Sequence, residues 1–388
     1  MINLSDIALW EWILVGVLGL VFLVQVYWYA RYLAAPARTM RRNKAPETGS
    51  TPPVSVLICA RNEGINLADY IHAWLSQDYP EYEVIIVDDG SEDNTRDIIE
   101  QYAARDERLR MTFVPKGARV GSTKKLALTL AAKAARYDYF LLTDADCVPE
   151  SNQWIKSMMR GFGEKKDIVL GFSPYFADKG HINRLVRYET LFNGLHYVGA
   201  ALCGRPYMGV GRNLAYRKSL FVASGGFSHL MTNRAGDDDL FVNHFSSSSN
   251  TAVVLNRESY TWSTAKKNFK EWWQQKRRHL SVSPAYRTGT KYQLLFEPLS
   301  RGAFYGIAIA LVVLGYMAGL TMPKGLFLAG IACILFLVRW ILQTMILNIS
   351  ARRMGLQRFS PFSILWFDIV IPLVNLWMLC IPHKKIQW

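Results

Sequence analysis

The chain has 388 residues, and its 45 Lys and Arg against 31 Asp and Glu give a net charge of +14. This length suits one catalytic domain with membrane segments better than a single globular unit. A basic chain can bind nucleic acid, an anionic membrane or a phosphate-rich ligand. Because 51% of the residues are hydrophobic and form long runs, the composition favours the membrane and argues against nucleic acid.

Five cysteines are scattered along the chain without any C-x-x-C pair. They are Cys59, Cys147, Cys203, Cys333 and Cys380. An odd and scattered set argues against both a disulfide framework and a zinc site. This pattern fits a domain in a reducing compartment that faces the cytosol.

The uncharged stretch Ile13–Tyr29 is predicted to be a transmembrane helix. No small-residue cleavage site follows it, so we expect an anchor (residues 1–33) and not a removed signal peptide. Acidic residues, Asp6 and Glu11, precede it, and basic residues follow: Arg31, Arg38, Arg41, Arg42 and Lys44. The positive-inside rule then places the following chain in the cytoplasm, beginning with a basic, proline-containing linker (residues 34–53).

Short apolar runs alternate with amphipathic stretches in residues 54–265. The predicted strands are Val54–Ile58, Glu83–Val87, Tyr139–Thr143 and Ile168–Gly171. The predicted helices are Asn66–Ser76, Thr95–Ala104 and Lys124–Ala135. This alternation predicts an α/β catalytic domain with a mostly parallel sheet, whose ligands bind at the carboxyl ends of the strands.

The chain becomes apolar again towards its C-terminus. Residues 266–301 are predicted to form interfacial helices, and residues 302–388 about three membrane segments: Gly302–Pro323, Gly325–Ser350 and Pro361–Pro382. The basic loop with Arg352, Arg353 and Arg358 is expected in the cytoplasm. The prolines of the last segment leave open whether it spans or is re-entrant. Arg339 and Asp368 are intramembrane charges, and we expect them to pair and hold two helices together.

Polar motifs follow the first two predicted strands. The first strand ends in Cys59–Glu63 and the second in Val87–Ser91, which contains Asp88 and Asp89. A carboxylate at a strand end can accept hydrogen bonds from a nucleotide base or ribose. The alternative for the second motif is an Asp-Gly turn with a helix cap.

Two aspartates, Asp144 and Asp146, end the apolar run Tyr139–Thr143. Strand alternation would point both the same way, so that they share one divalent cation that neutralises a leaving diphosphate. The alternative is a solvated loop. Arg119, Lys124 and Lys125 lie at the start of a predicted helix, where Lys124 can meet a phosphate, or where the helix start is simply exposed.

Two further motifs lie closer to the C-terminal membrane segments. Gly236–Leu240 holds three adjacent carboxylates, one of which can serve as a general base; the alternative is an acidic, solvated loop. Glu271–His279 combines two indoles with three cations, a pattern that is also typical of an interfacial amphipathic helix.

The order of these motifs resembles that of the membrane-integrated family 2 glycosyltransferases, which include cellulose, hyaluronan and poly-N-acetylglucosamine synthases. The landmarks are Ala60–Glu63, Val87–Ser91, Lys124 with Ala127 and Leu128, Asp144–Asp146, and Asp237 ahead of Gln275–His279. Residues Gly209–Arg217 and Gly225–Phe227 look like the family's acceptor-side loop. The resemblance implies a GT-A fold, a Rossmann-like α/β cytoplasmic domain with transmembrane helices at both ends.

The resemblance also implies roles for single residues. On the donor side it implies nucleotide contacts by Arg61, Glu63, Asp88 and Asp89, and diphosphate contacts by Lys124, Asp144, Gln275 and Arg278. It implies that Asp144 and Asp146 hold Mg²⁺ or Mn²⁺. The acceptor side would comprise Gly211, Arg212, Asn213 and His279. Asp237 matches the catalytic base, although Gly236 replaces the family's Glu, which leaves Asp238 as the other candidate.

One departure concerns processivity, because His279 replaces the Trp of the family's acceptor platform. His279 is expected to titrate near neutral pH. The reaction predicted is inverting transfer of a sugar from a nucleotide diphosphate sugar to a membrane lipid, a lipid-linked acceptor or a growing glycan. The resemblance implies a UDP-linked donor. We expect this transfer at the cytoplasmic face of the inner cell membrane, by an integral multi-pass protein.

Three alternatives remain at this point. One is a processive synthase that also exports its polymer. A second is a membrane scaffold that binds a nucleotide sugar without turnover. A third is a transporter, which about three C-terminal apolar segments disfavour because an alternating-access bundle needs more. The sequence does not name the sugar.

Overall fold

The computed structural model describes residues 7–41, 51–115, 117, 121–231, 233 and 235–381. The chain divides into two compact units. The described residues of Met1–Ala35, Thr288–Arg352 and Leu356–Trp388 form one, and those of Pro36–Arg287 with Arg353–Gly355 form the other. All five cysteines are free, as expected from their spacing.

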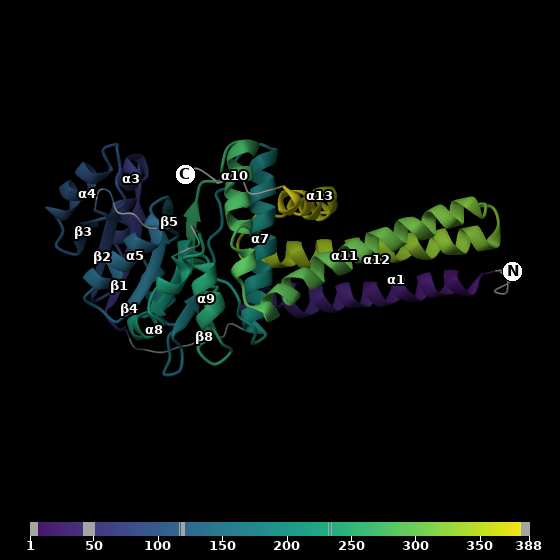
Figure 1. Cartoon of the computed structure of the whole chain (residues 1–388), viewed down its shortest axis with the longest axis horizontal. Coiled ribbons are helices and arrows are strands. Elements are labelled where there is room, and N and C mark those ends of the chain that lie inside the picture. The colour runs from purple at the N-terminus through teal and green to yellow at the C-terminus, as the bar shows by residue number, and fades with distance from the viewer. Residues whose placement is uncertain are drawn as a thin grey trace. The chain divides into compact units, whose positions relative to one another are not determined.

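The larger unit is built on a seven-stranded sheet with the order β3-β2-β1-β4-β7-β6-β8 (Figure 1). Its strands are β1 (Val54–Ala60), β2 (Tyr82–Asp88), β3 (Leu109–Phe113), β4 (Tyr139–Asp144), β6 (Ile168–Leu170), β7 (Leu214–Arg217) and β8 (Thr251–Val253). Strands β1 to β4 are parallel, and β7 is the one strand of this sheet that runs the other way. A separate antiparallel pair joins β5 (Cys147–Pro149) to β9 (Thr261–Ser263).

Helices surround this sheet because its central strands are apolar on both faces. The larger unit contains α3 (Gly64–Leu75), α4 (Thr95–Ala103), α5 (Thr123–Ala134), α6 (Trp154–Met159), α7 (His181–Leu202), α8 (Lys218–Ala223), α9 (Asp239–Phe245) and α10 (Phe269–Leu280). Short helical turns are η3 (Gly211–Asn213), η4 (Ser228–Leu230), η5 (Arg257–Ser259) and η6 (Ser283–Ala285). Side chains of α3, α4 and α6, including the buried Trp74 and Trp154, pack on one face of the sheet against Val56 and Val84.

The predicted strands and helices of this unit are confirmed to within one or two residues at most ends. Strand β3, which follows α4, was not predicted. The three-residue strands β5, β8 and β9 were not predicted either. Their runs are too short, or too mixed in polarity, to show a period of two. Strand β3 pairs with the longer β2, β8 pairs with β6, and β5 and β9 pair with each other, so their strand conformation depends on tertiary pairing. The mostly parallel α/β architecture is confirmed.

The smaller unit consists of long apolar helices. They are α1 (Leu9–Trp28), which continues as the π-helical turn η2 (Tyr29–Leu33), α11 (Thr288–Met317), α12 (Pro323–Arg353) and α13 (Pro361–Cys380). The segment α2 (Ala35–Arg41) follows η2. Within the described residues, four helices are long and apolar enough to cross a membrane: Leu9–Leu33, α11, α12 and α13. Leu18 of α1, Leu311 of α11 and Leu328 of α12 share a buried apolar cluster.

The helix α11 begins at Thr288, before the uncharged run that starts at Gly302. The extra turns carry Glu297 and Arg301, which are both buried. The predicted segment began only at Gly302 because the prediction was based on an uncharged run. An apolar helix nevertheless tolerates charged side chains where they are paired. In Figure 1, α1, α11 and α12 lie in the plane of the view, whereas α13 is seen nearly end-on.

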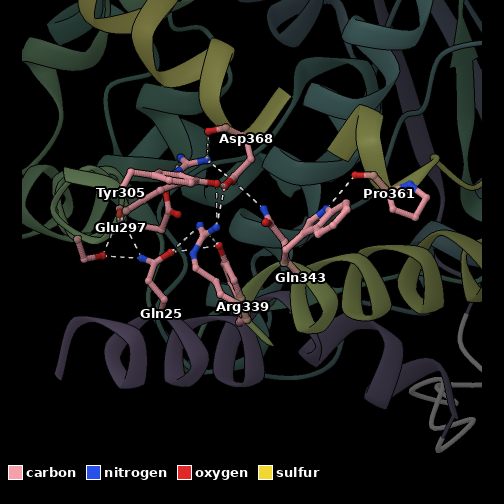
Figure 2. Close-up of polar contacts among 11 residues, drawn as sticks. Gln25, Glu297, Tyr305, Arg339, Gln343, Pro361 and Asp368 are labelled. Atoms are coloured by element: carbon pink, nitrogen blue, oxygen red, sulfur yellow. Dashed lines mark hydrogen bonds and ion pairs between the residues drawn. The ribbon is translucent and has the colours of Figure 1, made fainter. Parts of the chain in front are cut away.

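A cluster of polar side chains joins the four apolar helices (Figure 2). We call it the membrane polar cluster, and its members are Gln25, Tyr29, Glu297, Arg301, Tyr305, Arg339, Gln343 and Asp368. The carboxylate of Asp368 accepts hydrogen bonds from four side chains at 2.6–2.9 Å: Arg301, Tyr305, Arg339 and Gln343. The predicted pairing of Arg339 with Asp368 is confirmed, with 2.9 Å between Nη1 and Oδ2.

The same cluster reaches the N-terminal helix. Arg339 donates to Gln25 Oε1 at 3.1 Å and to the Tyr29 hydroxyl at 2.6 Å. Arg301 pairs with Glu297 at 2.8 Å as well as with Asp368. Each of these four charged side chains therefore has an opposite charge at 2.8–2.9 Å. Such pairing is what allows charge to be buried among apolar helices.

Candidate functional site

The candidate site begins where β1 and β2 end, side by side. Asn62 follows β1 in a left-handed conformation (φ 55°), which asparagine tolerates better than most residues. Its backbone N–H donates to Ser91 Oγ at 3.0 Å, and its side-chain oxygen accepts from the backbone N–H of Glu92 at 2.8 Å. The first two predicted motifs therefore form one connected edge of the sheet.

The residues expected to hold the nucleotide lie along this edge. Asp88 is buried and accepts from the backbone N–H of Ser91 at 3.0 Å. Asp89 accepts from the Thr123 hydroxyl at 2.6 Å, and burial raises the pKa of Asp89. Glu63 is half-buried, and burial likewise raises its pKa. Arg61 is exposed beside them, so its side chain is free to approach a ligand from solvent.

Lys124 joins two of the predicted functional aspartates. Its ammonium lies 2.9 Å from Asp144 Oδ1, at the end of β4, and 3.1 Å from Asp237 Oδ2. Burial alone would lower the pKa of Lys124, but the carboxylates of Asp144 and Asp237 raise it well above its ordinary value. The pKa of Asp144 is lowered, because Lys124 outweighs the opposing effect of burial. Two residues far apart in the sequence thus share one permanent cation.

The aspartates predicted to hold a metal ion do not lie on one strand. Asp144 is the last residue of β4, and Asp146 lies in the turn between β4 and β5. The alternation argument was therefore wrong in its geometry, because the chain leaves the strand at Ala145. Among the described residues, no group of three or more His, Cys, Asp or Glu side chains is arranged as a metal site. Two carboxylates fit Mg²⁺ or Mn²⁺ when substrate phosphates and water complete the shell.

Local geometry distinguishes the three carboxylates at the start of α9. Asp238 caps this helix: its oxygens accept from the backbone N–H groups of Asp239 at 2.8 Å and of Gly211 at 2.6 Å. Asp239 is buried and accepts from the Tyr286 hydroxyl at 2.7 Å. Asp237 instead contacts the Lys124 ammonium, which also pairs with Asp144. Of the two base candidates, Asp237 is therefore the one whose carboxylate belongs to the site.

Gly236 explains one departure from the family pattern. Its φ is +87°, which strains any residue with a Cβ. A Cβ built there would lie 2.5 Å from Leu240 Cδ1. The backbone at this position therefore suits glycine and would be strained by a glutamate.

Lys125 is a supporting residue whose role the sequence did not show. An exposed helix start was one of the alternatives left open for these lysines, but the side chain of Lys125 is completely buried. Its ammonium donates to the carbonyl oxygens of Leu230, Asn233 and Ala235, each at 2.7 Å. These carbonyls belong to the loop that leads into Asp237. A lysine with three backbone acceptors therefore holds the loop of the candidate base.

The loop predicted to face the acceptor contributes support as well as potential contacts. Asn213 is completely buried, and its amide binds Trp154 Nε1, Phe172 O and Ser259 O at 2.7–3.1 Å. The side chain of Asn213 thus makes its hydrogen bonds within the fold. This corrects the expectation that Asn213 faces an acceptor. Gly211 is buried and donates to Asp238.

Helix α10 carries the Gln-x-x-Arg motif and is held against α7. Trp272 Nε1 donates to Glu189 Oε2 at 3.1 Å, and Lys276 pairs with the same carboxylate. Gln275 lies 3.5 Å from the hydroxyl of Tyr175, a residue that sequence reasoning missed. The charge of Arg278 contributes to the lowered pKa of Asp144, so it lies on the same side of the site.

His279 differs from its expectation. Although it is exposed, the surrounding protein and the charges of Arg278 and Lys276 lower its pKa below the ordinary value. It is therefore neutral near pH 7, and the prediction that it titrates there was wrong. A histidine among cations loses its proton more readily because the charged form is repelled.

The fold and the carboxylates at its strand ends define a glycosyltransferase of the GT-A fold. Residues 55–224 match the family described as Glycosyl transferase family 2. Residues 55–224 therefore form a glycosyltransferase domain of this family, as the motif order predicted.

Two curated relatives illustrate the range of similarity. The chain is 26% identical over 345 residues to "Probable glycosyltransferase YdaM" of Bacillus subtilis, which covers 81% of this chain and 79% of that one. It is 37% identical over 95 residues to the poly-beta-1,6-N-acetyl-D-glucosamine synthase of Staphylococcus epidermidis. That match covers 24% of this chain and 22% of the synthase.

A solved structure shares the fold over most of the chain. It is the mannosyltransferase PcManGT from Pyrobaculum calidifontis, in complex with GDP-Man and Mn²⁺. The TM-score is 0.58 at 18% identity, and the similarity covers 89% of this chain and 98% of the other. At this identity the likeness concerns the fold.

Proposed function

We propose that the protein transfers a sugar, with inversion, from a nucleotide diphosphate sugar to a membrane lipid, a lipid-linked acceptor or a growing glycan. The observation that carries this proposal is the position of Lys124, within 3.1 Å of both Asp144 and Asp237. It brings a donor-side carboxylate and a candidate base to the same cation. This is the proximity that a single displacement between two bound substrates requires.

In this mechanism, Asp237 accepts the proton of the acceptor hydroxyl as its oxygen attacks the anomeric carbon. The bond from that carbon to the nucleoside diphosphate breaks on the opposite face. Lys124 and Arg278 supply fixed positive charge for the departing diphosphate. Because Lys124 is held by two carboxylates before the reaction, it needs little reorganisation when the charge develops.

A divalent cation fits this arrangement. Asp144 and Asp146 would hold Mg²⁺ or Mn²⁺ together with the donor diphosphate, and the ion would neutralise charge on the leaving group. The Mn²⁺ and GDP-Man of the mannosyltransferase with the same fold support this assignment. Asp88 and Asp89 are proposed to bind the nucleoside, and uracil is the base that we expect from the family resemblance.

The proposed location is the cytoplasmic face of the inner cell membrane. Four apolar helices support membrane insertion, and the basic residues after the first helix support this orientation. A catalytic unit joined to such helices at both ends reaches acceptors embedded in the bilayer.

A panel of UDP-, GDP- and CMP-sugars with Mn²⁺ or Mg²⁺ tests the proposal in purified membranes. We expect metal-dependent release of a nucleoside diphosphate from one sugar, which is lost in Asp146→Asn and Asp237→Asn. Donor binding without turnover, in folded protein supplied with lipid extract, would instead support the non-catalytic scaffold.

A processive synthase is the second candidate function, and the similarity to the poly-N-acetylglucosamine synthase favours it. His279 in place of an aromatic platform weighs against it. Product size on a gel decides: a ladder that lengthens during a chase indicates a polymer, and a single shifted lipid indicates one transfer.

A further inference from the structure

Arg212 presents a buried nitrogen that the fold leaves without a partner. Its Nη1 is screened from solvent and makes no hydrogen bond with any described residue. A charged donor buried in this way costs free energy unless a ligand completes it.

The guanidinium is nevertheless held firmly in place. The Arg212 carbonyl oxygen accepts from the Thr143 hydroxyl at 3.0 Å and from the Thr261 hydroxyl at 2.7 Å. Its guanidinium carbon lies 4.2 Å from the centre of the Tyr175 ring, which is within cation–π range. The backbone and the side-chain plane of Arg212 are thus both positioned before any ligand binds.

The surroundings connect this group to the proposed reaction. The neighbouring Gly211 donates to Asp238, and Tyr175 also contacts Gln275 of the Gln-x-x-Arg helix. Burial lowers the pKa of Arg212, but Tyr175, Cys147, Asp146 and Asp144 together raise it. The hydrogen bond from the Thr143 hydroxyl to the Arg212 carbonyl oxygen joins the acceptor-side loop to the strand that ends in Asp144.

We propose that Arg212, supported by Tyr175, is a phosphate-binding residue of this site. A guanidinium presents its donors in a planar fork that matches phosphate oxygens. The inference rests on the proposed transferase function. Two substrates of such an enzyme carry this chemistry: the diphosphate of the donor, and the phosphate of a phosphorylated lipid acceptor.

The test uses the full-length protein and the variants Arg212→Gln, Arg212→Lys and Arg217→Gln. Arg217 is the matched control because it also stacks on a tyrosine, Tyr139, at 4.8 Å, whereas its nitrogens are engaged by Lys166 O, Gly163 O and the Tyr139 hydroxyl. The soluble probes are UDP and GDP, with uridine and guanosine as references, measured by calorimetry with Mn²⁺. The lipid probes are a polyprenyl phosphate and the corresponding polyprenol, measured by native mass spectrometry.

We expect Arg212→Gln to weaken binding of a phosphate-bearing probe by about 10- to 100-fold and to leave its phosphate-free reference unchanged, since hydrogen bonds to charged groups have this strength. Arg212→Lys should fall between this variant and the wild type, because it keeps the charge without the fork. A loss confined to UDP or GDP assigns the donor diphosphate, and a loss confined to the polyprenyl phosphate assigns the acceptor.

The proposal is overturned if Arg212→Gln binds all the probes like the wild type, or if Arg217→Gln loses as much affinity. Failure of the proposed function is a separate result. In that case no sugar donor turns over, although the phosphate affinity still depends on Arg212.

Discussion

The membrane polar cluster and the candidate site both bury charged side chains, but they match those charges differently. In the cluster, Arg301 and Arg339 each have a carboxylate at 2.8–2.9 Å, and Asp368 accepts from four side chains. In the site, Lys124 is shared by two carboxylates. Arg339 Nε in the cluster and Arg212 Nη1 in the site both lack a hydrogen-bond partner among the described residues, but the guanidinium of Arg339 is also paired with the Asp368 carboxylate at 2.9 Å.

This difference shows when buried charge indicates structure and when it indicates a binding site. Charges that are paired with one another hold elements together. A positioned cation that no carboxylate neutralises gains free energy when a ligand of opposite charge binds. The pairing of Arg339 with Asp368 supports the structural role that the sequence predicted for these two residues.

The largest expected effect comes from the site. Replacing Asp237 with Asn should lower kcat about 10²- to 10⁴-fold, because a general base contributes this much. Binding of the nucleoside diphosphate should persist, since the donor-side residues remain. The measurement is steady-state transfer beside calorimetric nucleotide binding.

Asp238→Asn serves as the comparison variant for that experiment. The structure assigns Asp238 to capping α9, so its loss should affect stability more than turnover. If Asp238→Asn abolished transfer while Asp237→Asn retained it, the assignment of the base would have to be reversed.

In the membrane polar cluster, by contrast, we expect a substitution to lower stability and to leave nucleotide binding unchanged. Asp368→Leu leaves two buried arginines without this acceptor, and we expect a loss of about 3–5 kcal/mol of stability, as for one broken partner of a buried ion pair. Thermal unfolding in detergent measures it. Nucleotide affinity in the surviving folded protein should be unchanged. Wild-type stability in both Asp368→Leu and Arg339→Leu would rule out a structural role for the pair.

A smaller effect is expected at Lys125. Lys125→Met removes the donor to three carbonyl oxygens of the loop before Asp237, and leaving buried carbonyls unpaired costs about 1–3 kcal/mol. We expect lower kcat together with a lower melting temperature. Lys133→Met is the control, because Lys133 is exposed on the same helix. Equal behaviour of the two variants would contradict the supporting role.

An effect on stability similar in size to that expected at Lys125 concerns pH. Burial and the neighbouring Asp238 raise the pKa of Asp239 to about 8. The folded protein therefore holds this proton between about pH 4 and pH 8, where the unfolded chain has released it. Folding binds a proton in that window, so the contribution of Asp239 to stability falls as pH rises towards 8 and is constant above it.

From pH 6 to 8 this change amounts to at most about 3 kcal/mol. The measurement is the melting temperature across this range. Asp239→Asn carries no titrating proton at this position, so its melting temperature should decline less steeply. An identical slope in wild type and variant would show that Asp239 does not titrate there.

Local patterns in the sequence were sufficient for much of this protein. Continuous apolar runs predicted β1, β2 and β4, because strands covered on both faces need no polar side. The four apolar helices were recognisable from length and composition. The polar motifs at the strand ends were also found, since the carboxyl ends of parallel strands meet at one edge whatever their separation in the sequence.

The tertiary structure decided how single side chains are used. Lys124 and Lys125 are adjacent and chemically alike, yet one bridges two carboxylates and the other is buried under the loop before Asp237. Asn213 belongs to the same motif as Arg212, but its side-chain amide is hydrogen-bonded within the fold. Such differences depend on which distant segments of the chain pack against a residue. A periodic pattern indicates only which face of its own element a residue occupies, so it does not predict these tertiary contacts.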